Sequence, residues 1–188
     1  MAYANLTYLK NYLGITVTGD DNLLTNLLTR AEGIIDAFTG RHFEAVTATN
    51  YFDNSFVSGQ DLNLYGYDLL SITKLTNGDA VEIVAADYRL FPRNDNPKWK
   101  IRLDSGKSWS FSSDDSEVSI AGTGGYATVA PADIQHATIR LAAFLYRQKD
   151  TSADVDRPMI TGDGVTIMPS GLPSDVQKML ERYKRRIA

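Results

Sequence analysis

The side chains that could carry acid–base or metal chemistry are few in this sequence and lie far apart. The chain has two histidines, His42 and His136, and no cysteine. His42 follows a predicted helix end, where a cation interacts favourably with the helix dipole, and His136 lies beside the apolar stripe of another predicted helix. Neither has a second histidine or a carboxylate at metal-ligand spacing. We therefore predict a structural or surface role for both histidines.

Two further segments resemble ligand-binding motifs without completing them. Gly122–Tyr126 is rich in glycine but lacks the Lys-Ser/Thr pair of a phosphate-binding loop, so we interpret it as a hinge between a strand and a helix. Asp154, Asp156, Asp163 and Gly164 lack the alternating ligands and closing glutamate of a calcium loop. The Gly-x-Ser-x-Gly nucleophile elbow does not occur. The sequence predicts no catalytic residue, no metal site and no cofactor, and a protein that is not an enzyme.

Length and composition set the class of protein. The chain has 188 residues, of which 43% are hydrophobic and 22% charged, which is enough for a packed core without disulfides. The lack of cysteine fits synthesis in a reducing cytosol. Met1–Asn5 has neither the basic nor the apolar region of a signal peptide. No apolar run reaches the roughly 18 residues of a membrane-spanning helix, so we expect no membrane association.

Charge is distributed unevenly along the chain. Residues 43–125 include 7 Lys/Arg and 12 Asp/Glu, whereas residues 131–188 include 9 and 7. The basic excess of the second segment lies at the end of the chain. We predict that the middle segment is not a nucleic-acid-binding surface. The basic end is either such a surface or an ordinary solvated helix face.

Hydrophobic periodicity predicts helices at the start of the chain and strands after them. Leucines of Leu6–Leu13 share one helix face, and a longer apolar stripe covers residues 23–38. From residue 43 to residue 120 the pattern changes to alternation, and Asn77–Gly78 is a strong hairpin signal. Both tryptophans, Trp99 and Trp109, lie in this stretch. We therefore expect five to seven short antiparallel strands with a small core of their own.

Helical periodicity returns after the strands. Pro131 suits the first position of a third helix, which extends to Arg147. A last amphipathic helix begins near Leu172, where Ser174 and Gln177 have the spacing of a capping box. Its apolar face lies opposite its basic residues.

These elements predict an α+β fold in which a helical core of about four helices carries an inserted antiparallel β domain between the second and third helices. The helical core comprises residues 1–42 and 126–150, and the β domain residues 43–125. Residues 151–171 form a flexible arm that is rich in Gly, Pro and Asp. Residues 172–188 form a basic amphipathic helix at the C-terminus.

Three phrases of this sequence resemble the head–tail connector (adaptor) family of tailed bacteriophages. The first is Tyr8–Ile15, which precedes the long helix ending at Phe38–Phe43 (FTGRHF). The second is Gly125–Ile134, which enters the third predicted helix, and the third is Leu172–Pro173 before the last one. Together they span both ends of the chain, whereas residues 44–122 match the family less well.

The resemblance implies a structural virion protein without an active site. Members of the family form rings, typically dodecamers, beneath the portal at the head–tail interface. The implied partners are other copies of the chain, the portal protein and the downstream neck, stopper or tail protein. DNA passes through the ring without sequence-specific binding. The implied localisation is the neck of the virion, after synthesis in the host cytoplasm.

We assign candidate residues to two of these contacts. A ring requires a contact between different faces of neighbouring copies. The candidate ring-core residues are Leu27, Leu28, Ile34, Ile35, Leu141 and Leu145. The candidate portal-docking residues, which we expect to become ordered on assembly together with the preceding arm, are Lys178, Arg182, Tyr183, Lys184, Arg185 and Arg186.

Two other functions stay open at this point. Another neck or tail component, such as a stopper or tail-completion protein, is one alternative. A glycan-binding module is the other, because the aromatic residues of the β domain could stack on sugars.

Overall fold

A computed structural model describes residues 3–113, 116–148, 159–160, 166–167 and 172–185. The chain forms two compact units. The helical unit comprises Met1–Thr39 and Pro131–Lys184, and the β unit comprises Gly40–Ala130 and Arg185–Ala188. The predicted α+β fold class is confirmed. No described helix has the length and apolarity needed to cross a membrane.

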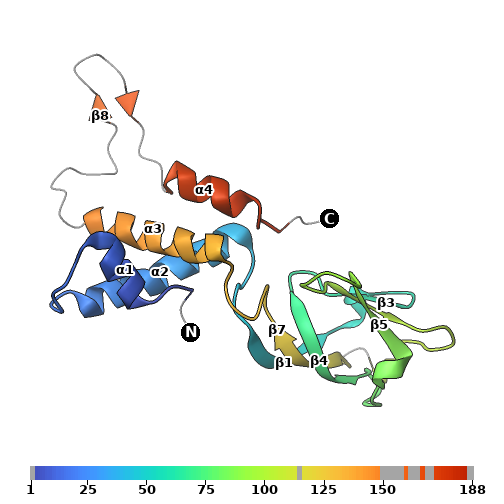
Figure 1. Ribbon diagram of the computed structural model, residues 1–188. Helices are drawn as coiled ribbons and strands as arrows, with labels where there is room; N and C mark the ends of the chain where they lie inside the picture. Colours follow the sequence, from blue (N-terminus) through green and yellow to red (C-terminus); the bar gives the residue numbers. More distant parts are fainter. Residues whose placement is uncertain (1–2, 114–115, 149–158, 161–165, 168–171, 186–188) are drawn as a thin grey trace. The chain divides into compact units, whose positions relative to one another are not determined.

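The helical unit contains four α-helices: α1 (Leu6–Leu13), α2 (Asp21–Thr39), α3 (Ala132–Gln148) and α4 (Ser174–Glu181) (Figure 1). Local sequence sets both ends of α1. The Asn5 side chain accepts a hydrogen bond from the Tyr8 N–H, and Gly14 ends the helix at a φ of 71°. A short antiparallel pair, β8 (Met159–Ile160) and β9 (Thr166–Ile167), lies between α3 and α4 in the sequence.

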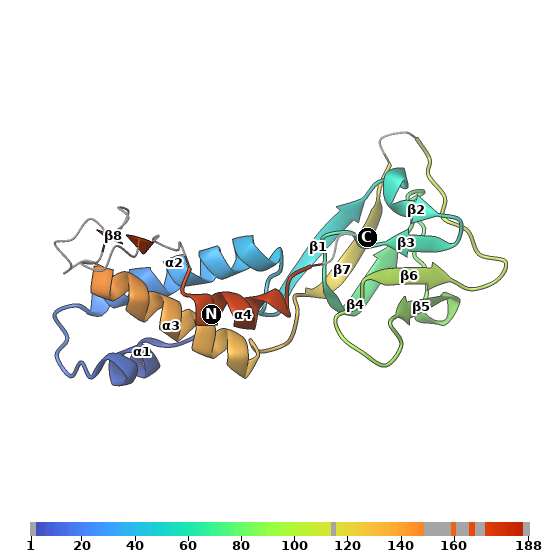
Figure 2. The ribbon, with the colours of Figure 1, turned by 90° about the horizontal axis from the view of Figure 1, so that it is seen from above.

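One apolar core joins the four helices. Helix α2 packs against α3, and α4 lies along α3 (Figures 1 and 2). Small side chains on α3, Ala137, Ala142 and Ala143, are buried and allow this close approach. The other fully buried apolar residues of this core include Leu9, Leu24, Leu28, Ile35, Ile134, Leu141, Val176 and Leu180.

Helix α4 differs from the sequence prediction in its start and its length. The predicted capping box is wrong: Pro173 is the N-cap residue, and no side chain caps the helix. Ser174 is already the first helical residue, so its hydroxyl is not in the position from which an N-cap accepts. The helix ends at Glu181, so residues 182–185 lie beyond it and do not form one continuous helical face with Lys178.

The β unit contains two antiparallel sheets (Figures 1 and 2). The three-stranded sheet has the order β1 (Val46–Phe52), β7 (Val118–Gly124), β4 (Leu69–Thr76). The four-stranded sheet has the order β2 (Val57–Ser58), β3 (Asp61–Asn63), β6 (Lys100–Leu103), β5 (Tyr88–Phe91). Two 3-10 turns, Asn54–Phe56 and Ala85–Asp87, precede β2 and β5.

Alternating side chains from both sheets form the core of the β unit. Strand β7 buries every second residue, from Val118 to Gly124. The buried cluster comprises Phe52, Leu62, Leu64, Leu69, Leu75, Ile101, Val118 and Ile120. Trp109 packs against this cluster, but Trp99 does not: 53% of its surface is exposed. The β unit therefore has its own core, as predicted, with only one of its two tryptophans.

The glycine-rich segment is part of a strand. We predicted a hinge at Gly122–Tyr126, but Gly122 and Gly124 lie in β7, and Gly125 follows the strand with a φ of 123°. A Cβ on Gly122 would collide with the Ser71 carbonyl oxygen of β4, where the β4–β7 register shifts. Glycine is required here because the two backbones approach too closely for a side chain.

We predict opposite effects for two glycine-to-alanine substitutions. Gly122→Ala should lower the free energy of unfolding by about 1–3 kcal/mol, because the new methyl group overpacks the β4–β7 contact. Gly33→Ala on α2, where a Cβ meets no atom within 4 Å, should raise it by about 0.5–1 kcal/mol. Urea denaturation followed by circular dichroism measures both. Equal stability of the two variants would contradict the close approach at Gly122.

Candidate interface surfaces

The residues predicted to dock on a portal lie in different surroundings. Lys178 is exposed on α4. Arg182 forms an ion pair with Asp133 of α3 at 3.0 Å, and the Tyr183 hydroxyl lies 3.4 Å from the same carboxylate. The Lys184 ammonium lies 5.3 Å from the ring centroid of Phe38. Arg186 lies outside the described residues. The segment that follows α4 therefore already makes contacts within one subunit.

A second ion pair fixes α4 on α3. Arg140 of α3 donates to Asp175 in the first turn of α4, with its Nε 2.9 Å from the carboxylate oxygen, and to the Tyr12 hydroxyl. The guanidinium lowers the pKa of the Asp175 carboxyl below its usual value. Asp175 also lies at the positive end of the α4 dipole. The position of α4 therefore depends on specific polar contacts in addition to its two buried residues, Val176 and Leu180.

Arg185 is largely buried, with 17% of its side chain exposed. Within the β unit, its guanidinium lies 2.8 Å from Asp68, whose side chain is only 6% exposed. Arg41 donates to both carboxylate oxygens of Asp68, at 2.7 and 2.9 Å, and stacks 5.4 Å from the ring centroid of Tyr126. One buried carboxylate thus holds two arginines that are 144 positions apart in the sequence. Sequence reasoning missed this cluster because no local pattern links its members.

The candidate ring-core residues divide into two groups by burial. Leu28, Ile35 and Leu141 are at most 3% exposed, so they pack inside one subunit and are not available to a neighbouring copy. Leu27, Ile34 and Leu145 are partly exposed at the edges of the same helices. A ring contact of the helical unit, which stays a prediction, is therefore restricted to this second group.

The outer face of the four-stranded sheet is basic. Strand pairing places Arg89 opposite Arg102, and Arg102 opposite Asp61, across three neighbouring strands. Asp61 accepts hydrogen bonds from Arg102 at 2.5 and 2.7 Å and from Lys100 at 3.2 Å. The Lys100 ammonium lies between two aromatic rings, 5.3 Å from the centroid of Phe91 and 5.4 Å from that of Trp99. Five of the seven Lys/Arg of residues 43–125 lie between residues 89 and 102.

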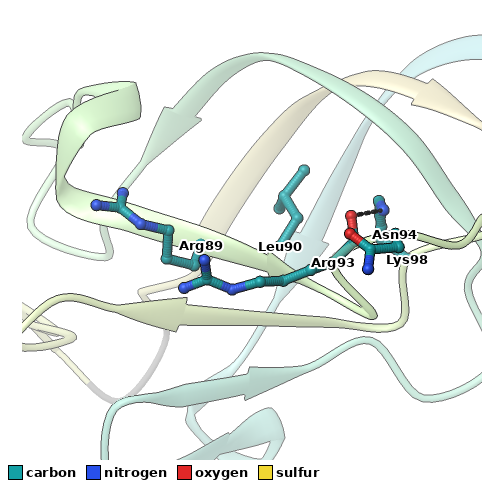
Figure 3. A pocket seen from close by; sticks show the side chains of 5 residues that line it. All are labelled: Arg89, Leu90, Arg93, Asn94 and Lys98. Carbon is teal, nitrogen blue, oxygen red and sulfur yellow. Dashed lines mark hydrogen bonds between the residues drawn. The ribbon is translucent and has the colours of Figure 1, made fainter.

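A shallow pocket of about 440 Å³ opens beside this face. Its lining, shown in Figure 3, consists of Arg89, Leu90, Arg93, Asn94 and Lys98. We call it the basic pocket. Its cations and amide suit a partner that carries a carboxylate, whereas the Leu90 side chain packs against the core of the β unit. It has no nucleophile or acid–base pair in its lining. The clustering of basic residues is visible in the sequence, but the net charge summed over residues 43–125 concealed it.

The loop that forms the basic pocket is held in one conformation. The Lys98 ammonium donates to the backbone carbonyls of Pro92, Arg93 and Asp95, at 2.7, 3.1 and 2.7 Å. Lys98 also exchanges backbone hydrogen bonds with Leu69 at the start of β4. The loop is therefore tied both to itself and to the neighbouring sheet.

Strand β1 is an uncharged edge of the three-stranded sheet. It pairs with β7 on one side, and Val46 and Tyr51 are 51% and 62% exposed. The other end of the sheet order, β4, is bridged on its outer side by Lys98 and Glu82. An uncharged edge strand accepts additional strands readily, so β1 is a second surface suited to protein contacts.

The described residues contain no cluster of three or more His, Cys, Asp or Glu side chains that could hold a metal ion. The acidic motif at 154–164 lies outside them. Ser71 and Lys74 have Ser-x-x-Lys spacing, but they lie on a strand, where the Lys74 ammonium is 3.8 Å from Glu82. The geometry therefore offers contact surfaces and no assembled catalytic group among the residues described.

These features describe an α+β protein with a basic sheet face, exposed aromatic side chains and an uncharged edge strand. The chain belongs to the head completion protein family, whose sequence profile matches residues 4–186. This confirms the resemblance to connector and completion proteins of phage necks. No curated protein sequence matches the chain.

Solved structures share the fold. A chain from the neck of an empty GTA particle computed with C6 symmetry has a TM-score of 0.69 at 20% identity, covering 99% of this chain and 92% of that one. A chain from the neck of a native GTA particle computed with C12 symmetry has a TM-score of 0.63 at 22% identity, covering 97% and 90%. A chain from the virion of a native gene transfer agent (GTA) particle has a TM-score of 0.64 at 21% identity, covering 99% and 92%.

We predict a pH-dependent contribution from Asp61. The Arg102 hydrogen bond lowers the pKa of Asp61 below its usual value, so its ion pairs stabilise the fold above the unfolded pKa of about 3.9 and lose this effect as the pH falls through the lowered pKa. Asp61→Asn should lower the Tm at pH 7, and the deficit should narrow between about pH 5 and pH 3. Thermal unfolding across this range tests it, with the exposed-loop variant Asp95→Asn as control. A deficit that does not change with pH would contradict this role.

Proposed function

We propose that this chain is a ring-forming head–tail connector, which joins the portal of a phage-like particle to the next neck or tail protein and extends the DNA channel. The observation that carries the proposal is family membership over residues 4–186. The shared fold of chains from necks with C6 and C12 symmetry supports a ring of six or twelve copies. The proposed location is the virion neck, after synthesis in the host cytoplasm.

The proposed role needs interfaces and no chemistry. A closed ring uses one heterologous contact repeated around an axis, and each copy needs further surfaces for the portal above and the next protein below. The basic pocket, the β1 edge and the exposed side of α4 offer three such surfaces. DNA passes along the channel without base-specific contacts. The protein is proposed to be non-enzymatic.

We assign the portal contact to the exposed side of α4. Lys178 is exposed, and Arg182 has 67% of its side chain exposed although it pairs with Asp133. An ion pair this exposed contributes little to stability, so Arg182 can exchange Asp133 for a carboxylate of the portal at small cost. Arg185, which is held by buried Asp68, is left out of this contact.

Mass photometry with and without the portal protein of the same particle tests the proposed function. We expect rings of six or twelve copies that bind the portal. Free subunits are compatible with the proposal if the portal induces the ring. A chain that stays monomeric and never associates with the portal would overturn it.

A charge reversal on α4 tests the assigned portal contact. Lys178→Glu should weaken portal binding about tenfold, because the contact we propose pairs Lys178 with a carboxylate of the portal, and should leave subunit stability unchanged. The matched control is Arg30→Glu, which reverses the charge at an exposed position on α2. Binding of fluorescently labelled subunits to immobilised portal measures both. Equal affinity of the two variants would remove α4 from the portal contact.

A further inference from the structure

We propose that the ring contact is made when the basic pocket of one copy receives the hairpin 77–84 of the next copy. The inference rests on the proposed ring and names the surfaces that close it. It is carried by two loops of the β unit whose chemistry is complementary and whose positions prevent them from meeting within one chain. We call residues 77–84 the acidic hairpin.

The acidic hairpin combines exposed apolar and acidic side chains. Val81 and Val84 are 60% and 54% exposed, which is unusual for valines in a unit that has a well-packed core. Asp79 and Glu82 are exposed beside them. The ion pair of Glu82 with Lys74 is long, at 3.8 Å, and both side chains are more than half exposed, so it hardly restrains Glu82.

The acidic hairpin is rigid because of Asn77, which is 8% exposed. Its amide donates to the Ser108 carbonyl at 3.2 Å, and its side-chain oxygen accepts from the backbone N–H groups of Gly78 and Ser110. The backbone of the turn is closed by Asn77 N–H to Val81 O at 2.8 Å. A preorganised loop loses little conformational entropy when it binds.

The basic pocket matches these side chains. Arg89, Arg93 and Lys98 give its lining a positive charge, and the ring of Phe91 lies beside Arg93 and Lys100. Arg93 is exposed and lies 5.7 Å from the ring centroid of Phe91. Exposed Trp99 extends the apolar area beside the pocket. Arginine and tryptophan are the residue types that most often dominate protein interfaces.

Strand β4 holds the two loops apart. Its first residue, Leu69, is bridged by Lys98 of the pocket loop, and its last residue, Thr76, is bridged by Glu82 of the acidic hairpin. Seven steps along a strand correspond to about 23 Å. The pocket and the hairpin of one β unit therefore cannot fill each other. Two different, complementary surfaces on one rigid body produce a heterologous contact that propagates from copy to copy, which is the type of contact a ring requires.

The charges of the pocket favour a protein occupant over DNA. Asp61 and Asp104 neutralise part of the basic face through their pairs with Arg102 and Arg89. Tight phosphate binding depends on many cations in a continuous track, whereas here carboxylates and the rings of Phe91 and Trp99 lie among the cations. The acidic hairpin of the second copy supplies a carboxylate for these cations and a valine for the exposed Trp99 beside them.

Charge reversal and rescue test the contact on the full-length chain. Arg93→Glu in the pocket and Glu82→Lys in the hairpin should each raise the protein concentration at which rings form at least tenfold. The double variant should recover most of this loss. The matched controls reverse the charge at exposed positions elsewhere in the β unit and should assemble as the wild-type chain does. They are Lys107→Glu and Glu117→Lys. Circular dichroism verifies that each variant is folded.

The absence of cysteine from the natural sequence permits a direct second test. Asn94→Cys and Val81→Cys subunits, mixed, assembled and oxidised, should form a disulfide between copies that neither variant forms alone. Rings that assemble without this cross-link, or without rescue by the double variant, would overturn the inference and leave the proposed function intact. Salt-sensitive binding of double-stranded DNA that Arg93→Glu abolishes would also overturn it. Failure of every variant and of wild type to form rings with the portal would instead overturn the proposed function.

Discussion

The β unit depends on one buried carboxylate. Asp68 binds Arg41 and Arg185 through its side chain, and its backbone carbonyl accepts from the Gly125 N–H at 2.8 Å. These partners belong to the segments by which the chain enters the β unit, leaves it and returns at the C-terminus. Asp68 thus connects all three segments. Removing it would leave two arginine charges in a largely buried site, which costs far more than an exposed ion pair contributes.

Local patterns predicted the helices of this fold well and its polar clusters poorly. Leu6–Leu13 is a helix with the predicted bounds, and the turn at Asn77–Gly78 forms. In both cases the information lies within a few neighbouring residues. The Asp68 cluster and the ion pair of Arg140 with Asp175 join residues that are far apart in the sequence, and no periodicity encodes them. The same limit applies to α4, which packs on α3 although its predicted side-chain cap does not form.

The candidate interface residues show a related limit. An apolar stripe predicts which side of a helix is covered but does not say by what. Leu28 and Leu141 are covered by their own subunit, and Leu27 and Leu145 remain partly exposed on the same helices. Trp99 shows the reverse case, because a tryptophan expected in the core is largely exposed. The apolar residues that are buried within one chain must be known before the exposed apolar residues can be assigned to contacts between chains.

The basic residues of the β unit are concentrated on one part of its surface, so the net charge of the unit does not describe any one face. The unit is acidic overall, yet five of the seven basic residues of 43–125 gather around β5, β6 and the loop between them. If a neighbouring copy covers this basic region, the cations left in that segment are Lys74 and Lys107, against an excess of carboxylates. The uncovered surface would then repel phosphate. The separation of charge that gives the copies complementary contacts would also keep the rest of the β unit from binding DNA. Ring assembly and free passage of the genome are therefore compatible with the same charge distribution.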